Sequence, residues 1–226
     1  MIKAVIIDFD DTLCMTEEAC FVIENIVAQE MGFPPMTRDH HRMNWGKPLG
    51  EAIKERIPGI DAPEFMRRIA IYIEKHAGEG ILDSVQEKNL KTLDEMIASG
   101  KKLAILTSRT YGEVKHLLEE QHPLNKRMEK IYHKDNSDFL KPDPRVFDKI
   151  LAELAVAPSE AVYIGDAVTD AIAAKEAGLH FIAVMESGLR TKEDFSGKPV
   201  DFFANSFTEV VSCVSELNCF ETRTVR

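Results

Sequence analysis

The sequence contains few cysteines, and their spacing suggests neither a metal site nor a disulfide framework. Its four cysteines, Cys14, Cys20, Cys213 and Cys219, form no Cys-x-x-Cys pair, so we expect reduced thiols. No apolar run approaches the roughly 18 residues that a membrane span needs. Met1 leads into an apolar segment without the features of a signal peptide. We therefore expect a cytoplasmic protein that has no membrane partner.

Positive charge is also scarce. There are 28 Lys and Arg residues against 38 Asp and Glu residues, which gives a formal net charge of −10. Such a charge disfavours nonspecific binding to nucleic acid or to an anionic membrane, and a site for a phosphorylated ligand would need locally placed cations. Internal repeats and low-complexity segments are absent as well. With 226 residues, 44% of them hydrophobic, the chain fits one large domain, or one domain with a modest insertion.

The chain is predicted to begin with a strand and to continue with helices. Residues 3–7 form a short apolar run rich in β-branched residues, which is typical of a strand buried on both faces of a parallel sheet. Helical patterns follow at 17–31, 49–56 and 63–76, separated by a polar stretch at 37–45 and by turn residues. No strand is needed between about Met15 and Gly80.

From Ser84 onward, strands and helices alternate, which indicates a parallel sheet with crossover helices. The expected strands are 102–106, 130–133, 161–164, 180–185 and 201–204, and the expected helices are 86–98, 112–121, 144–154, 169–177 and 207–217. The sequence therefore predicts an α/β fold with a Rossmann-like parallel sheet core, formed by residues 1–14 and 81–226. Residues 15–80 are predicted to form a helical cap inserted after the first strand.

Acidic residues follow two of the predicted strands. Asp8 and Asp10 come directly after the first strand, and Asp166 and Asp170 follow the strand at 161–164. In open α/β sheets, ligands bind at the carboxyl ends of the strands. Carboxylates held close together repel one another unless a cation lies between them or one keeps a proton, and oxygen ligands favour magnesium. A charged turn or a position at a helix N-terminus would explain each acid separately.

Two further polar residues are candidates for binding an anion. Thr107 follows the strand at 102–106, where a hydroxyl beside backbone N–H groups can hold an anionic oxygen or simply cap the next helix. Lys141 lies in the short loop Lys141-Pro142-Asp143-Pro144, where its charge could offset phosphoryl charge and carboxylate repulsion. A solvated loop lysine is the simpler interpretation.

Taken in order, these residues resemble the four signature motifs of the haloacid dehalogenase-like hydrolase superfamily. They are Asp8-Phe9-Asp10-Asp11-Thr12-Leu13, Thr107, Lys141-Pro142 and Gly165-Asp166-Ala167-Val168-Thr169-Asp170. The resemblance covers essentially the whole chain. It points to the branch with a helical cap after the first strand, the branch of phosphoglycolate phosphatases and β-phosphoglucomutases.

The resemblance implies a role for each group. Asp8 would be the nucleophile that forms an aspartyl-phosphate, and Asp10 would be the general acid and then the general base. Mg²⁺ would be held by the carboxylates of Asp8 and Asp166 and the backbone carbonyl of Asp10. Asp170 would be a further ligand or would support the ligands. Thr107 and Lys141 would grip the phosphoryl oxygens. Because relatives that release halide or cleave phosphonates lack an acid at the position of Asp10, its presence points to phosphate monoesters.

The resemblance also suggests where a substrate would be contacted. The candidates are Trp45, Gly46 and Lys47 in the cap, and Ser108 and Arg109 directly after Thr107. A cation at either place could bind a carboxylate or a second phosphate, and Trp45 could cover the site from water. A solvated inter-helix loop with Trp45 in the small cap core is the alternative interpretation.

The sequence departs from the family pattern in two places. Asp11 stands where many relatives have glycine, which adds a third acid near the site. The Pro-Gly pair often seen where the chain re-enters the core is absent near Asp83-Ser84-Val85. Neither departure removes a predicted catalytic group.

We expect a Mg²⁺-dependent phosphatase that acts on a small phosphorylated metabolite, with phosphoglycolate as the first candidate by resemblance, and that exists as a monomer or homodimer. A phosphomutase and an inorganic pyrophosphatase are the alternatives with the same chemistry. A catalytically inactive binding protein on the same fold is a third. A response-regulator receiver gathers similar groups, but it is about half this length and lacks an inserted helical bundle.

Overall fold

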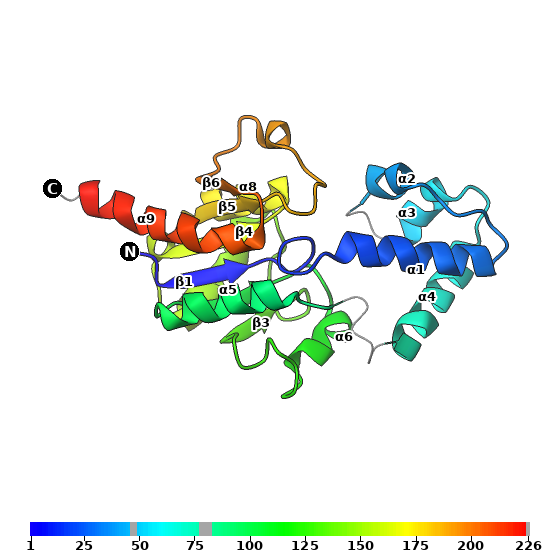
Figure 1. Cartoon of the computed structure of the whole chain (residues 1–226), viewed down its shortest axis with the longest axis horizontal. Coiled ribbons are helices and arrows are strands. Elements are labelled where there is room, and N and C mark those ends of the chain that lie inside the picture. The colour runs from blue at the N-terminus through cyan, green and yellow to red at the C-terminus, as the bar shows by residue number, and fades with distance from the viewer. Residues whose placement is uncertain (46–48, 77–82, 225–226) are drawn as a thin grey trace. The chain divides into compact units, whose positions relative to one another are not determined.

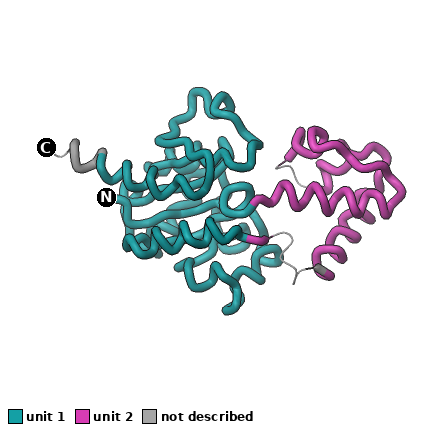
Figure 2. The backbone as a smooth tube through the Cα atoms, in the orientation of Figure 1, with its two compact units in different colours: residues 1–14, 85–226 teal, residues 15–84 magenta. Residues whose placement is uncertain are grey.

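The computed structural model describes residues 1–45, 49–76 and 83–224. The chain divides into two compact units (Figure 2): a core unit of residues 1–14 and 85–226, and a helical unit of residues 15–84. The predicted boundary between residues 80 and 81 lies outside the described residues, and the assignment of a catalytic core and a cap stays a prediction. None of the helices within the described ranges is long and apolar enough to cross a membrane.

The core unit is built on a six-stranded parallel sheet with the order β3-β2-β1-β4-β5-β6 (Figure 1). The strands are β1 (Ala4–Ile7), β2 (Lys102–Leu106), β3 (Lys130–Tyr132), β4 (Ala161–Gly165), β5 (His180–Val184) and β6 (Phe202–Ala204). The chain starts in the middle of the sheet, builds outward to β3 and then crosses back to β4. This arrangement confirms the predicted Rossmann-like α/β fold.

Strand β1 shows why the sheet has an apolar core on each face. Val5 and Ile7 belong to one apolar cluster, with residues of α5 (Glu87–Ala98) and α9 (Val210–Thr224). Ala4 and Ile6 belong to the other cluster, with residues of α7 (Asp148–Leu154) and α8 (Val168–Glu176). Because successive side chains of a strand point to opposite faces, a continuous apolar run can supply both cores at once.

Three helices of the core unit differ from the prediction. The helix expected at 207–217 begins as a 3₁₀ turn, Phe207–Glu209, and continues as α9 to Thr224. The helix expected at 112–121 is a single turn, α6 (Tyr111–Val114), followed by a 3₁₀ turn at Lys115–Leu118. Gly112 is a poor helix former, and the backbone becomes extended at Glu119. The helix expected at 144–154 likewise begins as a 3₁₀ turn, Pro144–Phe147, before α7.

The helical unit contains α1 (Thr16–Glu30), α2 (Arg38–Met43), α3 (Leu49–Arg56) and α4 (Ala62–His76). Its apolar core is small and includes Ile23, Val27, Ile53, Phe65 and Ile69. Helix α2 occupies the stretch that was predicted only to be polar. The Thr37 side chain accepts a hydrogen bond from the His40 backbone N–H at 3.3 Å, which caps its first turn.

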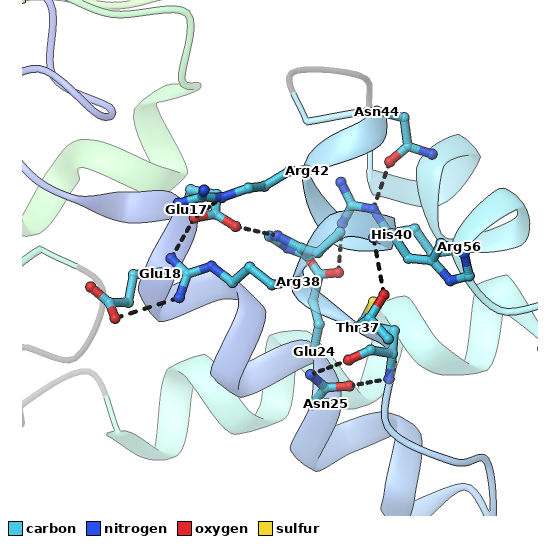
Figure 3. Close-up of polar contacts among 12 residues, drawn as sticks. Glu17, Glu18, Glu24, Asn25, Thr37, Arg38, His40, Arg42, Asn44 and Arg56 are labelled. Carbon is cyan, nitrogen blue, oxygen red and sulfur yellow. Dashed lines mark hydrogen bonds and ion pairs between the residues drawn. The ribbon is translucent and has the colours of Figure 1, made fainter. Parts of the chain in front are cut away.

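A buried ion network joins α1, α2 and α3 (Figure 3). The ring of His41 is fully buried, with Nδ1 2.8 Å from a Glu17 carboxylate oxygen and Nε2 3.3 Å from a Glu24 oxygen. Arg56 Nη1 donates to the second Glu24 oxygen at 2.6 Å. The Arg56 and Glu24 side chains are only 2% and 3% exposed, so either charge left alone would carry a large desolvation cost.

Replacing Arg56 with methionine should destabilise the helical unit by about 3 kcal/mol, because Glu24 would stay buried without its main cation. Urea unfolding followed by the fluorescence of Trp45, the single tryptophan of the chain, would measure this change within the same unit. Arg67→Met is the matched control, since Arg67 pairs with Glu64 at 2.7 Å on the exposed side of α4 and should be replaceable without measurable loss. Equal losses for the two variants would contradict the importance of the buried network.

Candidate active site

Three neighbouring strands deliver polar residues to one edge of the sheet. Strand β1 pairs in parallel with β2 on one side and with β4 on the other, so the three carboxyl ends lie side by side. Asp8 follows β1, Thr107 follows β2 and Asp166 follows β4. This edge is where open α/β sheets bind their ligands.

Asp8, Asp166 and Asp170 form a buried acidic cluster at this edge. Each offers a carboxylate oxygen, and these oxygens all lie within 4.8 Å of one another. The Asp8 backbone N–H donates to the Ile164 carbonyl at 2.8 Å, which fixes Asp8 to the end of β4. Glycine is needed at position 165, because a Cβ there would overlap the Asp170 carboxylate. The structure thus brings together three side chains that were predicted to bind metal.

Lys141 is the cation within this acidic cluster. Its Nζ lies 3.0 Å from Asp8 Oδ1 and 2.8 Å from Asp170 Oδ1, and it donates to the Tyr163 hydroxyl at 2.9 Å. The Lys141 side chain is only 8% exposed, so the interpretation as a solvated loop lysine is wrong. Tyr163 was absent from the sequence-based prediction. Its signal was a polar aromatic residue within an otherwise aliphatic strand.

The charges of the acidic cluster do not balance, because one lysine faces three aspartates. Burial, offset by Lys141 and reinforced by Asp170 and Asp10, raises the pKa of Asp8 to about 7. Burial, together with the nearby Asp170 and Asp8, raises the pKa of Asp166 well above its ordinary value. Burial alone would lower the pKa of Lys141, but Asp170 and Asp8 hold that pKa well above its ordinary value.

The residues of the cluster fit a divalent cation. Carboxylate oxygens are the hard ligands that such cations prefer, and a bound dication would relieve the repulsion among Asp8, Asp166 and Asp170. The Asp10 carboxylate is not part of this group of side chains. Its predicted contribution through the backbone carbonyl stays a prediction.

The Asp10 carboxylate pairs instead with Arg109, which comes from the loop after β2. Arg109 Nη2 donates to Asp10 Oδ1 at 2.6 Å, and Nε lies 3.1 Å from both carboxylate oxygens. The guanidinium also lies over the Phe9 ring, 4.8 Å from its centroid. Arg109, which was predicted to contact substrate, thus binds Asp10, which was predicted to be the general acid.

The other two residues of the loop after β2 differ in exposure. Thr107 is buried, and its hydroxyl oxygen accepts a hydrogen bond from the Arg109 backbone N–H at 3.2 Å. The hydroxyl therefore helps to organise its own turn. Ser108 is exposed. Phosphoryl binding by Thr107 and substrate binding by Ser108 stay predictions.

Asp11 lies in the turn that follows β1, with a φ of 56°. This is the left-handed region, which favours glycine and which aspartate tolerates better than most residues. The Asp11 backbone N–H donates to the Cys14 carbonyl at 2.7 Å. The positive φ gives a physical reason for the glycine that many members of the resembled family have here.

Trp45 lies in the helical unit, next to the buried ion network. Its ring centroid is 5.1 Å from that of His41, and the Arg56 guanidinium lies 6.0 Å from it. These contacts place Trp45 against the interior of the helical unit, and substrate contact by Trp45 stays a prediction. Gly46 and Lys47, also predicted to contact substrate, lie outside the described residues.

Comparison with models of known protein families shows which family this chain belongs to. Residues 5–184 match the family model of the haloacid dehalogenase-like hydrolases. The chain belongs to this family. Phosphoglycolate phosphatase of Vibrio parahaemolyticus is 25% identical to it over 222 residues, covering 95% of this chain and 96% of that protein. Pyrophosphatase PpaX of Bacillus velezensis is 28% identical over 184 residues, covering 78% and 80%.

A solved structure of the same fold is that of CbbY from Rhodobacter sphaeroides in complex with phosphate. It superposes with a TM-score of 0.69 at 25% identity, covering 93% of this chain and 96% of that one. Membership of the haloacid dehalogenase-like hydrolases confirms the relationship predicted from the four motifs, and it excludes the response-regulator alternative. The phosphatase names of the relatives agree with the predicted class of phosphoric monoester hydrolase.

A divalent cation should stabilise this haloacid dehalogenase-like hydrolase, and more strongly at about pH 8 than at about pH 5. With its pKa raised from 3.8 to about 7, Asp8 holds a proton in the metal-free folded protein that the unfolded chain has lost. The metal-free protein therefore loses stability as pH rises through this range, and a bound cation offsets that loss.

Thermal unfolding with MgCl₂ and with EDTA, at both pH values, would measure the cation effect. Asp166→Asn should reduce the shift in unfolding temperature, because it removes one of the clustered carboxylates. Asp138→Asn replaces an exposed aspartate of the same unit and should leave the shift intact. The absence of any cation-dependent shift at the higher pH would contradict a metal site here.

Proposed function

We propose that this chain is a Mg²⁺-dependent phosphatase that hydrolyses small phosphate monoesters through an aspartyl-phosphate formed on Asp8. The proposal is carried by the acidic cluster, in which Asp8 lies 3.0 Å from Lys141 and within 4.8 Å of Asp166 and Asp170. A carboxylate nucleophile beside a fixed cation and hard metal ligands is what phosphoryl transfer requires of a protein. Membership of the haloacid dehalogenase-like hydrolases supports the same chemistry.

The reaction would proceed in two steps. In the first, an Asp8 oxygen attacks phosphorus while the bond to the leaving oxygen breaks, and Asp10 gives its proton to that oxygen. In the second, a water molecule gives a proton to Asp10 and attacks the aspartyl-phosphate, which releases phosphate and restores the Asp8 carboxylate. Lys141 would neutralise charge on the phosphoryl oxygens in both steps, and Thr107 would donate its hydroxyl to one of them.

The metal would be held by Asp8, Asp166 and Asp170, with the backbone carbonyl of Asp10. When bound, Mg²⁺ would neutralise charge on the phosphoryl oxygens and on the Asp8 carboxylate. In the first step, an acid at position 10 is useful where the leaving oxygen needs a proton. This requirement supports a phosphate ester with a basic alkoxide leaving group.

The names of the relatives support two substrates. The relative from Vibrio is named for phosphoglycolate and the one from Bacillus for pyrophosphate. Phosphoglycolate is the first candidate, because several of the similar proteins are named for it. Pyrophosphate is the second. A phosphomutase would use the same Asp8 and Asp10 and differ only in passing the phosphoryl group to a sugar hydroxyl.

Replacing Asp8 with asparagine should abolish phosphate release, because the amide is not a nucleophile for phosphorus. The variant should keep its fold, since the new side chain has nearly the same shape and relieves repulsion among the buried acids. Circular dichroism and a phosphate-release assay would test both expectations, with Asp138→Asn as the matched control. Retained turnover in the Asp8→Asn variant would rule out Asp8 as the nucleophile.

A substrate panel tests the function as a whole. Phosphate release would be measured from phosphoglycolate, pyrophosphate, and glucose 1- and 6-phosphates, with Mg²⁺ and with EDTA. We expect release only with Mg²⁺, concentrated on phosphoglycolate or on pyrophosphate. Interconversion of the glucose phosphates without release would identify a phosphomutase instead. No reaction with any compound would favour a catalytically inactive binding protein.

A further inference from the structure

The ammonium of Lys141 has polar partners of two kinds in the described part of the chain. Two are charged: the carboxylates of Asp8 and Asp170, at 3.0 and 2.8 Å. The third is neutral, the hydroxyl of Tyr163, to which Nζ donates at 2.9 Å. An ammonium has three N–H donors and no acceptor, so the number of partners equals the number of donors. Attraction between opposite charges explains the first two contacts but not the third.

Tyr163 is a fixed point beside this flexible lysine. Its side chain is fully buried on β4, and its ring makes a T-shaped contact with Phe147, with 5.0 Å between the centroids. Its hydroxyl donates to the Leu106 carbonyl at the end of β2, at 3.3 Å. A phenolic hydroxyl has one hydrogen, so this contact leaves the lone pairs of the oxygen for Lys141. The long stem of Lys141 is flexible, and its ammonium therefore depends on its partners for its position.

A bound divalent cation would affect the two kinds of partner differently. Asp8 and Asp170 belong to the acidic cluster, so a dication there neutralises much of the charge that attracts Lys141 and also repels the ammonium. The carboxylate oxygens keep lone pairs for Lys141, but the net attraction falls. Tyr163 carries no charge to be neutralised, and it is not one of the three side chains that fit a cation. Its hydrogen bond is therefore the contact of Lys141 that a cation weakens least.

We propose that Tyr163 is a positioning residue, whose hydroxyl holds Lys141 in the acidic cluster while a divalent cation is bound there. This inference rests on the proposed function and adds a residue to it. The proposed reaction needs both cations in one place, because Lys141 and Mg²⁺ neutralise charge on the same phosphoryl group. Two cations that share a site repel each other, and the tyrosine offsets this repulsion without adding another negative charge.

This role predicts opposite effects on cation binding and on turnover. An ammonium fixed beside the carboxylates weakens the binding of a divalent cation, and it stabilises the phosphoryl group during the reaction. Without the Tyr163 hydroxyl, Lys141 can move away as the cation binds, so the cation should bind more tightly while phosphate release becomes slower. General damage to the site would weaken both. A tyrosine that only packs in the core would leave both unchanged once its ring is kept.

Mg²⁺ binding by four forms of the full chain tests this role: the wild type, Tyr163→Phe, Lys141→Met and the double variant. Calorimetric titration with MgCl₂ would be done at about pH 8, where fewer protons compete with the cation. We expect Tyr163→Phe to bind Mg²⁺ about 3- to 10-fold more tightly than the wild type, and Lys141→Met to gain at least as much. The double variant should bind like Lys141→Met alone, because Tyr163 acts through Lys141 and the two effects are then not additive.

Turnover gives the second measurement. Phosphate release by Tyr163→Phe with saturating Mg²⁺ should fall by about 10- to 100-fold, mainly in kcat, which corresponds to the loss of one charged hydrogen bond. Tyr132→Phe is the matched control, because Tyr132 is also buried on a strand of the core unit and its hydroxyl donates to Glu153 at 2.8 Å, outside the acidic cluster. It should leave Mg²⁺ affinity and turnover unchanged. If circular dichroism shows that Tyr163→Phe does not fold, Tyr163→Met replaces it, since methionine lacks a hydroxyl and adapts to irregular space.

Three results would overturn the positioning role and leave the proposed function intact. They are weaker or unchanged Mg²⁺ binding in Tyr163→Phe, an effect on Mg²⁺ binding that adds to that of Lys141→Met, and unchanged turnover in Tyr163→Phe. A wild-type protein that binds no Mg²⁺ would overturn the proposed Mg²⁺-dependent function and this inference with it.

Discussion

Repulsion among the carboxylates of Asp8, Asp166 and Asp170 is the constraint on which the site depends. Strands β1 and β4 pair in parallel and end at the same edge of the sheet, so the acids that follow them lie close together. Glycine at position 165 lets the Asp170 carboxylate approach the end of β4, and Lys141 offsets only part of the charge. The local features that destabilise the folded core are therefore the ones that prepare it for a cation, a trade common at functional sites.

The apolar sheet makes this concentration of charge tolerable. Strand β1 is buried on both faces, and the helices on each face hold the strand ends in place, so the acids cannot relieve their repulsion by moving apart. The chain has a net charge of −10, and cationic side chains occupy particular positions at the site. In the described part of the chain, Lys141 lies inside the acidic cluster and Arg109 at its rim, each held by aspartates.

The helical unit is stabilised differently from the core unit. Its apolar core is small, and much of its interior is the ion network of Glu17, Glu24, His41 and Arg56 (Figure 3). Such a network tolerates fewer arrangements than apolar packing, because every buried charge must keep its partner. The ring of Trp45 lies beside this network, near His41 and Arg56.

The sequence by itself determined the fold class and the membership of the acidic cluster. Hydrophobic patterning shows where a strand ends, and an acid placed directly after a buried strand can only lie at the sheet edge; Asp8, Asp166 and Thr107 were located in this way. Tertiary structure alone decided the partners. That Lys141 is buried against Tyr163, that Arg109 binds Asp10, and that a polar stretch becomes helix α2 around His41 all depend on contacts between residues distant in the chain. Local sequence does not predict such contacts, because a long charged side chain can pair with any opposite charge that the fold brings near it.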